Sequence, residues 1–242
     1  MKQLDALLAA TDRLSRAVAK LSFDAPITHV YNPLQYASVP HENYLRAYAT
    51  NKKSVLFLGM NPGPFGMAQT GVPFGDVTMV RDYLKISAPV RKPKRMHPKR
   101  PIDGFSCTRS EVSGSRLWGA IAAQWSNPQD FFESHFIANY CPLVFMEESG
   151  KNRTPDKLPS REQSLLYNAC DLYLRELTHL LQPQIVIGVG KFAEGRAKAA
   201  LKDLDVRIAT VLHPSPASPK ANRGWASEAA KQLRALGIDA LG

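Results

Sequence analysis

Four short runs of large apolar residues constrain the fold of this 242-residue chain more than any other feature. Each is four to seven residues long and rich in valine, isoleucine, leucine or phenylalanine, which is typical of buried strands: residues 55–58, 136–139, 185–189 and 206–212. Segments with helical spacing lie between them. Because strands that alternate with helices form a parallel sheet covered on both faces, we expect a three-layer α/β/α sandwich with a central, mainly parallel four-stranded sheet.

Four segments carry apolar residues at helical spacing: 115–125, 160–181, 192–201 and 225–236. In the longest of them, Ser160 followed by Gln163 predicts a capping box, and Pro183 is expected to end the helix. Cys170 falls on the apolar face of this helix and is expected in the core. Residues 1–24 predict an amphipathic N-terminal helix. No internal repeat or linker is visible, so we expect one domain over residues 1–242.

Composition limits the possible partners. The formal net charge is +10, from 31 Lys and Arg against 21 Asp and Glu, which favours a polyanionic partner such as nucleic acid. No apolar stretch approaches the roughly 18 to 20 residues that cross a bilayer, so we expect no membrane partner. The three cysteines are scattered, which argues against a disulfide framework, a zinc site or an iron–sulfur cluster and fits a reducing intracellular compartment.

Two basic loops interrupt the pattern. In residues 91–100, six of the ten residues are Lys or Arg and none is acidic. Residues 149–155 form a second polar, basic loop, directly after an apolar segment. Both could be solvated surface loops. Their charge favours contact with a nucleic-acid backbone, since phosphates are bound chiefly by Lys, Arg and exposed N–H groups.

Two strands end in turns that are rich in glycine or proline. Residues 59–66 follow the first strand and present Asn61, and residues 213–216 follow the last strand and present His213. Ligands of open α/β sheets bind at the carboxyl ends of the strands. We therefore expect both side chains in one cleft.

The chemistry open to these two residues is narrow. Neither turn holds a carboxylate, and no Ser or Cys sits in a nucleophile elbow, so paired-carboxylate hydrolysis and covalent catalysis are poorly supported. An Asn that orients a reactant and a His that donates to developing negative charge suit a reaction in which an anionic group leaves before water attacks. Gly190 and Lys191 lack the earlier glycine of a phosphate-binding loop, which argues against a nucleotide-binding module.

Residues 59–75 closely resemble the first motif of the single-strand-selective monofunctional uracil-DNA glycosylases, and residues 213–216 with 222–225 resemble their second motif. The resemblance extends over about residues 25 to 237, with further matches at 139–143 and 149–152. It implies a uracil-DNA glycosylase-like fold. It also implies base excision repair without cofactor or metal: hydrolysis of the N-glycosidic bond of a flipped-out uracil in single- or double-stranded DNA, without strand cleavage.

The resemblance assigns roles to individual residues. Asn61 is expected to position the attacking water. His213 and the backbone N–H of Met60 are expected to hydrogen-bond the uracil oxygen on which charge builds. Phe74 would stack on the extruded base. Asn139 would read the Watson–Crick edge and reject cytosine, whose exocyclic amine reverses the donor and acceptor pattern.

Selection at the base C5 position is assigned by the resemblance to Gly63 and Met67, which would admit 5-hydroxymethyluracil and disfavour thymine. Ala217 departs from the family, whose members carry an arginine at this place, so we expect weaker filling of the vacated duplex stack and greater dependence on single-stranded or mispaired targets. The remaining candidate DNA contacts lie in the second basic loop and after the His-Pro turn: Ser149, Gly150, Lys151, Asn152, Ser215, Pro216, Ala217, Ser218, Asn222 and Arg223.

Two alternatives stay open on the sequence alone. One is a related glycosylase that prefers deaminated purines such as xanthine or hypoxanthine. The other is a catalytically silent protein that binds DNA lesions. In either case we expect a monomer that binds DNA, located in the cytoplasm or nucleoid of a bacterium or in the nucleus of a eukaryote.

Overall fold

A parallel four-stranded sheet forms the centre of the molecule. The computed structural model describes residues 2–241. The sheet has the order β3-β2-β6-β7, and every neighbouring pair is parallel. All residues of β2, β3 and β6 are buried, because helices cover both faces. The four predicted strands are confirmed as β2 (Val55–Gly59), β3 (His135–Asn139), β6 (Ile185–Val189) and β7 (Arg207–Val211).

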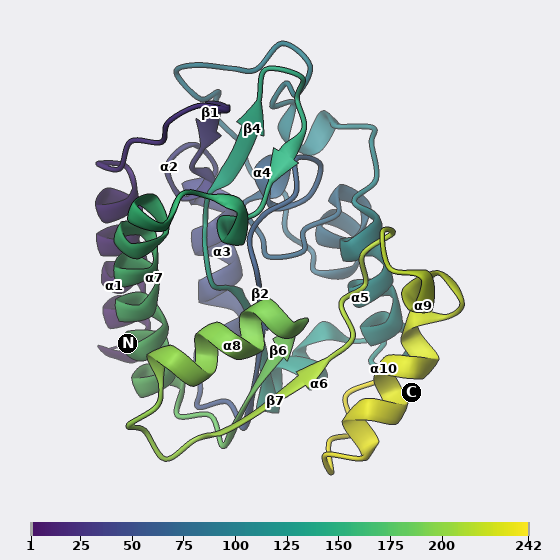
Figure 1. Cartoon of the computed structure of the whole chain (residues 1–242). Helices are drawn as coiled ribbons and strands as arrows, with labels where there is room; N and C mark the ends of the chain where they lie inside the picture. The colour runs from purple at the N-terminus through teal and green to yellow at the C-terminus, as the bar shows by residue number, and fades with distance from the viewer. Residues whose placement is uncertain (1, 242) are drawn as a thin grey trace.

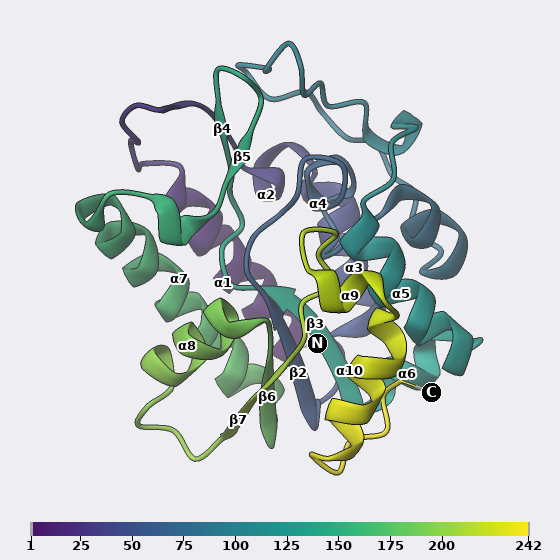
Figure 2. The ribbon, with the colours of Figure 1, turned by 45° about the vertical axis from the view of Figure 1, so that its right-hand side comes forward.

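Helices lie on both sides of this sheet. Figure 2 shows α7 and α8 on one side and α5 and α10 on the other, and α1 packs along α7 (Figure 1). The expected three-layer α/β/α arrangement is therefore confirmed. The bounds of these helices are α1 (Lys2–Val18), α5 (Val112–Gln124), α7 (Ser160–Leu181), α8 (Lys191–Ala200) and α10 (Trp225–Arg234).

Shorter elements fill the connections. Those in α-helical form are α2 (Pro33–Tyr36), α3 (Ser38–Tyr48), α4 (Met67–Thr70), α6 (Pro128–Ser134) and α9 (Pro219–Asn222). A π-helical turn, η1 (Met79–Tyr83), and two 3-10 turns, η2 (Gly104–Ser106) and η3 (Pro155–Lys157), complete the set. Within residues 2–241, none of the helices combines the length and the apolarity needed to cross a bilayer.

A second sheet was not expected from the sequence. It joins β1 (Ile27–Tyr31), β4 (Val144–Glu147) and β5 (Asn152–Arg153) in the order β1-β4-β5, and both pairings are antiparallel. The segment 149–155, interpreted as a loop, therefore includes a strand. Its polar residues carry no strand signal, and they pair because the preceding β4 offers its edge across a tight turn at Gly150, which has φ of 80°.

Two local expectations are wrong. Ser160 does not cap α7, because it is already the first helical residue and Pro159 occupies the cap position. The amide of Gln163 instead donates to the carbonyl of Leu158 at 2.8 Å. The N-terminal helix ends at Val18, short of the expected residue 24, and a connection then leads to β1. Cys170 is fully buried in the core, as expected.

Helix α5 approaches the turn at Phe74 unusually closely. A Cβ atom placed on Gly114 would clash with the backbone carbonyl of Phe74. Trp118, one turn further along, donates its indole N–H to the carbonyl of Pro73 at 3.2 Å. The absence of a side chain at Gly114 thus lets α5 support the backbone on which Phe74 is mounted.

We expect Gly114→Ala to destabilise the protein because the added methyl group meets backbone that cannot move alone. Gly119→Ala in the same helix is the matched control, since nothing lies within 4 Å of its added Cβ. That variant should gain about 0.5–1 kcal/mol from the helical preference of alanine. Urea denaturation of both variants measures the difference, and equal free energies of unfolding would contradict the close approach.

Candidate active site

The pocket that holds the predicted residues lies at the carboxyl ends of the parallel strands. Gly59 pairs with Asn139 between β2 and β3, and Val189 pairs with Val211 between β6 and β7, so the turns after β2 and β7 open at the same edge. The pocket encloses about 410 Å³ and is lined by Met60, Asn61, Pro62, Gly63, Pro64, Met67, Phe74, Glu111, Ser113, Asn139, Asn152, Thr154, His213, Ser215 and Pro216. All seven residues assigned to catalysis or base binding are among them.

Asn61 presents its amide oxygen to the pocket. Its Nδ2 group donates to the carbonyl of Leu143 at 3.1 Å, which fixes the orientation of the amide. The carbonyl of Pro62 accepts a weaker hydrogen bond from the same nitrogen at 3.4 Å. With the donor side occupied, Oδ1 remains as an acceptor that can hold a water molecule by one of its protons.

His213 is a neutral hydrogen-bond donor. The backbone N–H of Ser215 donates to its Nδ1 at 3.0 Å, so Nδ1 carries no proton and the neutral ring carries its hydrogen on Nε2. Burial lowers the pKa of His213 from 6.5 to about 4, because the charged imidazolium would lose its hydration. At neutral pH the ring therefore offers an N–H without a positive charge.

Phe74 provides an aromatic surface close to His213. The two ring centroids are 6.1 Å apart and the rings are tilted by 43°. Its backbone has φ of 53°, an unfavourable conformation for a bulky residue, and is held there by the hydrogen bond from Asp76 N–H to the Phe74 carbonyl at 2.8 Å. A Cβ on Gly59 would lie 2.6 Å from the ring, so glycine is needed at the end of β2.

Asn139 ends β3 with its amide directed into the pocket. Nδ2 donates to the sulfur of Met67 at 3.3 Å, which leaves its second hydrogen available. The amide oxygen lies where a side chain on Gly59 would be. Asn139 and Met67 are 9% and 3% exposed, so Met67 acts here as a buried support that orients the amide.

Glu111 is a pocket residue that sequence reasoning missed. It occupies the N-cap position of α5, and a Cβ on Gly63 would clash with its carboxylate. Burial raises the pKa of Glu111, while hydrogen bonds from the backbone N–H groups of Phe65 and Ser113 oppose this rise. Asp76 accepts from the Glu111 backbone N–H at 3.0 Å and fixes this segment. No pattern in the sequence marks a carboxylate so far from both motifs.

Three of the ten candidate DNA contacts line the pocket, and the other seven lie outside its lining. Asn152, Ser215 and Pro216 line it. Gly150 is buried in the turn between β4 and β5. Ser218 accepts from Ala221 N–H and caps α9. The others are exposed and face solvent: Ser149, Lys151, Ala217, Asn222 and Arg223.

Arg116 holds the loop after His213 in place. Its guanidinium donates to the carbonyl of Pro214 at 3.1 Å and to Oδ1 of Asn222 at 2.9 Å. The Asn222 amide in turn donates to the carbonyl of Pro216 at 2.9 Å. Arg116 lies on α5, far from this loop in the sequence, and no sequence pattern predicts the contact.

The pocket holds no metal-binding arrangement that we can identify. Within residues 2–241, no group of three or more His, Cys, Asp or Glu side chains could bind a metal ion.

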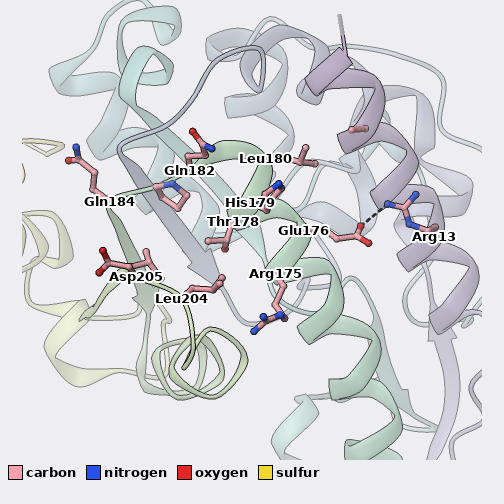
Figure 3. Close-up of a pocket in the computed structure, with 13 residues that line it drawn as sticks. Arg13, Arg175, Glu176, Thr178, His179, Leu180, Gln182, Gln184, Leu204 and Asp205 are labelled. Carbon is pink, nitrogen blue, oxygen red and sulfur yellow. Dashed lines mark hydrogen bonds and ion pairs between the residues drawn. The ribbon is translucent and has the colours of Figure 1, made fainter.

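A larger groove of about 770 Å³ lies elsewhere (Figure 3). It is formed by α1, the end of α7 and the segments that precede β6 and β7, so it lies at the amino ends of these strands. Arg13 and Glu176 form an ion pair of 2.8 Å on its wall. It contains none of the candidate residues, and ligands of such sheets bind at the opposite edge.

Comparison with known proteins gives consistent results. Residues 46–234 match the family model described as the uracil DNA glycosylase superfamily. The chain is 48% identical over 228 residues to the single-strand selective monofunctional uracil DNA glycosylase of Mus musculus, covering 93% of this chain and 82% of that protein. Its Bos taurus counterpart is 47% identical, with 93% and 84% covered.

A solved structure supports the fold. The crystal structure of wild-type Pedobacter heparinus SMUG2 superimposes with a TM-score of 0.67 and covers 94% of this chain and 97% of its own, at 20% sequence identity. At that identity the likeness concerns the fold alone.

We expect Gly63→Ala to destabilise the protein by roughly 1–3 kcal/mol, because the methyl group displaces the Glu111 carboxylate from its buried position. Truncating Glu111 to alanine should relieve this clash, because it removes the carboxylate that the new methyl group meets. The double variant Gly63→Ala/Glu111→Ala is therefore expected to lose less than the sum of the two single changes. Free energies of unfolding in urea measure all three, and strict additivity would show that the two side chains do not meet.

Proposed function

The chain belongs to the single-strand selective monofunctional uracil-DNA glycosylases of the uracil DNA glycosylase superfamily, and we propose that its pocket removes uracil and C5-oxidised uracils from DNA. These enzymes are hydrolases that act on N-glycosyl bonds. The observation that carries the proposal is the meeting of two groups in one pocket: the acceptor Oδ1 of Asn61 and the neutral Nε2–H donor of His213. The first suits a water molecule and the second suits a departing uracil anion.

His213 stabilises the leaving group. As the bond between the sugar C1′ and uracil N1 breaks, N1 takes the electron pair and the charge spreads to O2. The Nε2–H of His213 donates to this oxygen, together with the backbone N–H of Met60. A fixed donor in a water-poor site typically contributes about 3–4 kcal/mol to lowering a barrier, and it needs no net charge.

Asn61 positions the nucleophile. Its Oδ1 accepts a hydrogen bond from a water molecule, whose oxygen then bonds to C1′ of the sugar cation. The water gives up one proton and the uracil anion takes one up, so the products are free uracil and an abasic sugar. The strand stays intact, because no residue forms a covalent bond with the sugar.

Phe74 and Asn139 select the base. The Phe74 ring offers a surface for stacking the extruded pyrimidine. Uracil presents an acceptor at O4 and a donor at N3–H, which match the free Nδ2 hydrogen and the Oδ1 of Asn139. Cytosine presents an amine and an unprotonated nitrogen, and the orientation that Met67 gives the amide leaves both unmatched.

Gly63 and Met67 set the choice at C5. Since Gly63 has no side chain, this part of the pocket admits the Glu111 carboxylate, which offers acceptor atoms to water or to the hydroxyl of 5-hydroxymethyluracil. The Glu111 carboxylate beside Gly63 keeps it polar. A thymine methyl group would displace water without replacing its hydrogen bonds, which disfavours thymine.

Both single-stranded and duplex DNA are proposed substrates, with single strands favoured. The loop at Ser215, Pro216 and Ala217 is held by Arg116 and borders the pocket, which supports a role in filling the space of a flipped nucleotide. Ala217 is exposed and small, so it fills a duplex stack poorly. We propose that a monomer acts, in whichever compartment holds the cell's DNA.

We expect the protein to release uracil from a single-stranded oligonucleotide and to leave an alkali-labile site. Asn61→Ala should slow this release at least about a hundredfold at unchanged oligonucleotide binding, because it removes only the water-positioning oxygen. The assay follows alkali-dependent strand cleavage for matched oligonucleotides, single-stranded and duplex, that carry uracil, 5-hydroxymethyluracil, thymine, xanthine or hypoxanthine.

The other outcomes are distinct. Cleavage only at xanthine or hypoxanthine would keep the enzyme class and overturn the assignment of the base pocket. Oligonucleotide binding without release of any base would indicate a silent lesion binder. Equal rates for the wild-type protein and Asn61→Ala would remove the proposed role of Asn61.

A further inference from the structure

Two arginines pack on an aromatic ring beside the pocket. The guanidinium carbon of Arg109 lies 3.9 Å from the centroid of the Phe65 ring, and that of Arg100 lies 5.4 Å from it. We call these three residues the Phe65 platform. Their neighbours in the chain line the pocket, Pro64 directly before Phe65 and Glu111 two residues after Arg109. The platform therefore borders the mouth of the pocket.

The platform is tied to the second basic loop. Arg100 donates from Nε to the carbonyl of Gly150 at 2.9 Å, and its own carbonyl accepts from the hydroxyl of Tyr31 at 2.7 Å. Asn152, two residues beyond Gly150, lines the pocket. A continuous rim thus runs from Arg109 across Phe65 and Arg100 to the turn between β4 and β5.

The charges of the platform are not neutralised within the protein. Among residues 2–241, neither Arg100 nor Arg109 forms an ion pair with a carboxylate, whereas Arg13, Arg153, Arg175 and Arg196 each do. Arg109 is exposed, and stacking on the ring keeps its guanidinium at one place. Such a fixed, unpaired guanidinium is suited to a phosphate group.

The first part of the loop 91–100 lies against α2, away from the pocket rim. Arg91 donates from its backbone N–H to the carbonyl of Tyr36 and from its guanidinium to that of Gln35, both at 2.8 Å. Arg91, Lys94 and Arg95 line a separate groove with residues of α1 and α2. Only the end of this loop reaches the pocket rim.

We infer that the Phe65 platform is a phosphate-binding site for the DNA strand next to the flipped nucleotide, with Arg109 and Arg100 contacting the phosphodiester groups. The Phe65 ring holds the Arg109 guanidinium in place, whereas Arg100 is held by its hydrogen bond to Gly150. The inference rests on the proposed function, because that function places a DNA strand at the pocket mouth. It assigns a role to Phe65, a residue of the first motif that had none, and to Arg109, which lies outside both motifs and both basic loops. In the loop 91–100 it assigns a phosphate contact to Arg100.

The test is the salt dependence of binding to a lesion-free single-stranded oligonucleotide with a fluorescent label, over about 50 to 300 mM KCl. Each lost phosphate contact should reduce the slope of log Kd against log salt by about 0.7. We expect this reduction and several-fold weaker binding for Arg109→Gln. Arg234→Gln is the matched control, an exposed arginine at the end of α10 away from the pocket, and should leave the slope unchanged.

Phe65→Leu tests the platform itself. If the ring holds Arg109 in position, Phe65→Leu should weaken binding only while Arg109 is present, so the double variant should bind as Arg109→Gln does. Additive losses, or an unchanged slope for Arg109→Gln, would overturn the inference. Melting temperatures of the variants confirm that they fold.

Failure of the inference and failure of the proposed function give different results. If the slope of log Kd against log salt falls in Arg109→Gln but the wild-type protein releases no uracil, the phosphate site stands and the proposed reaction is refuted. If the protein releases uracil but the salt slope is the same in Arg109→Gln as in the wild-type protein, the proposed reaction stands and the phosphate site is refuted.

Discussion

The parallel pairing of β2 with its neighbours is the constraint on which the site depends. The register that places Gly59 beside Asn139 also places the turn that bears Asn61 at the edge where β7 leads into His213. The carboxyl ends of parallel strands share one edge, so residues that lie about 80 and 150 positions apart in the chain meet in one pocket. A slip of one residue in any of these pairings would turn the side chains to the other face and separate the groups.

Each reactive side chain has one face occupied by the protein and one left free. The Leu143 carbonyl accepts a hydrogen bond from the Asn61 amide nitrogen, so the amide oxygen of Asn61 stays free as an acceptor. The Ser215 N–H donates to Nδ1 of His213, so the Nε2–H of that ring stays free as a donor. Met67 takes one hydrogen of the Asn139 amide and leaves the other. These contacts decide whether a group acts as donor or acceptor before any substrate arrives, so no reorganisation is needed during the reaction.

Much of this could be predicted from the sequence, for physical reasons that differ between elements. The four strands were found because a buried parallel strand is apolar on both faces, and the turns at Asn61 and His213 because glycine and proline mark them. Glu111, Arg116 and the strand β5 were missed, since each owes its place to a contact with a distant segment: Gly63, Pro214 and β4 respectively. The expected cap at Ser160 failed because Pro159 took that position.

The most direct measurement is the pH dependence of uracil release from a single-stranded oligonucleotide under single-turnover conditions. Because burial lowers the pKa of His213 to about 4, the imidazole is neutral from pH 8 down to about 5.5, and the rate should be constant over that range and fall only below about pH 5. Glu111→Gln serves as the control for titration of the neighbouring carboxyl group. A twofold loss of rate near pH 6.5 that persists in Glu111→Gln would contradict the account, because it would show that His213 gains its proton as an ordinary exposed histidine does.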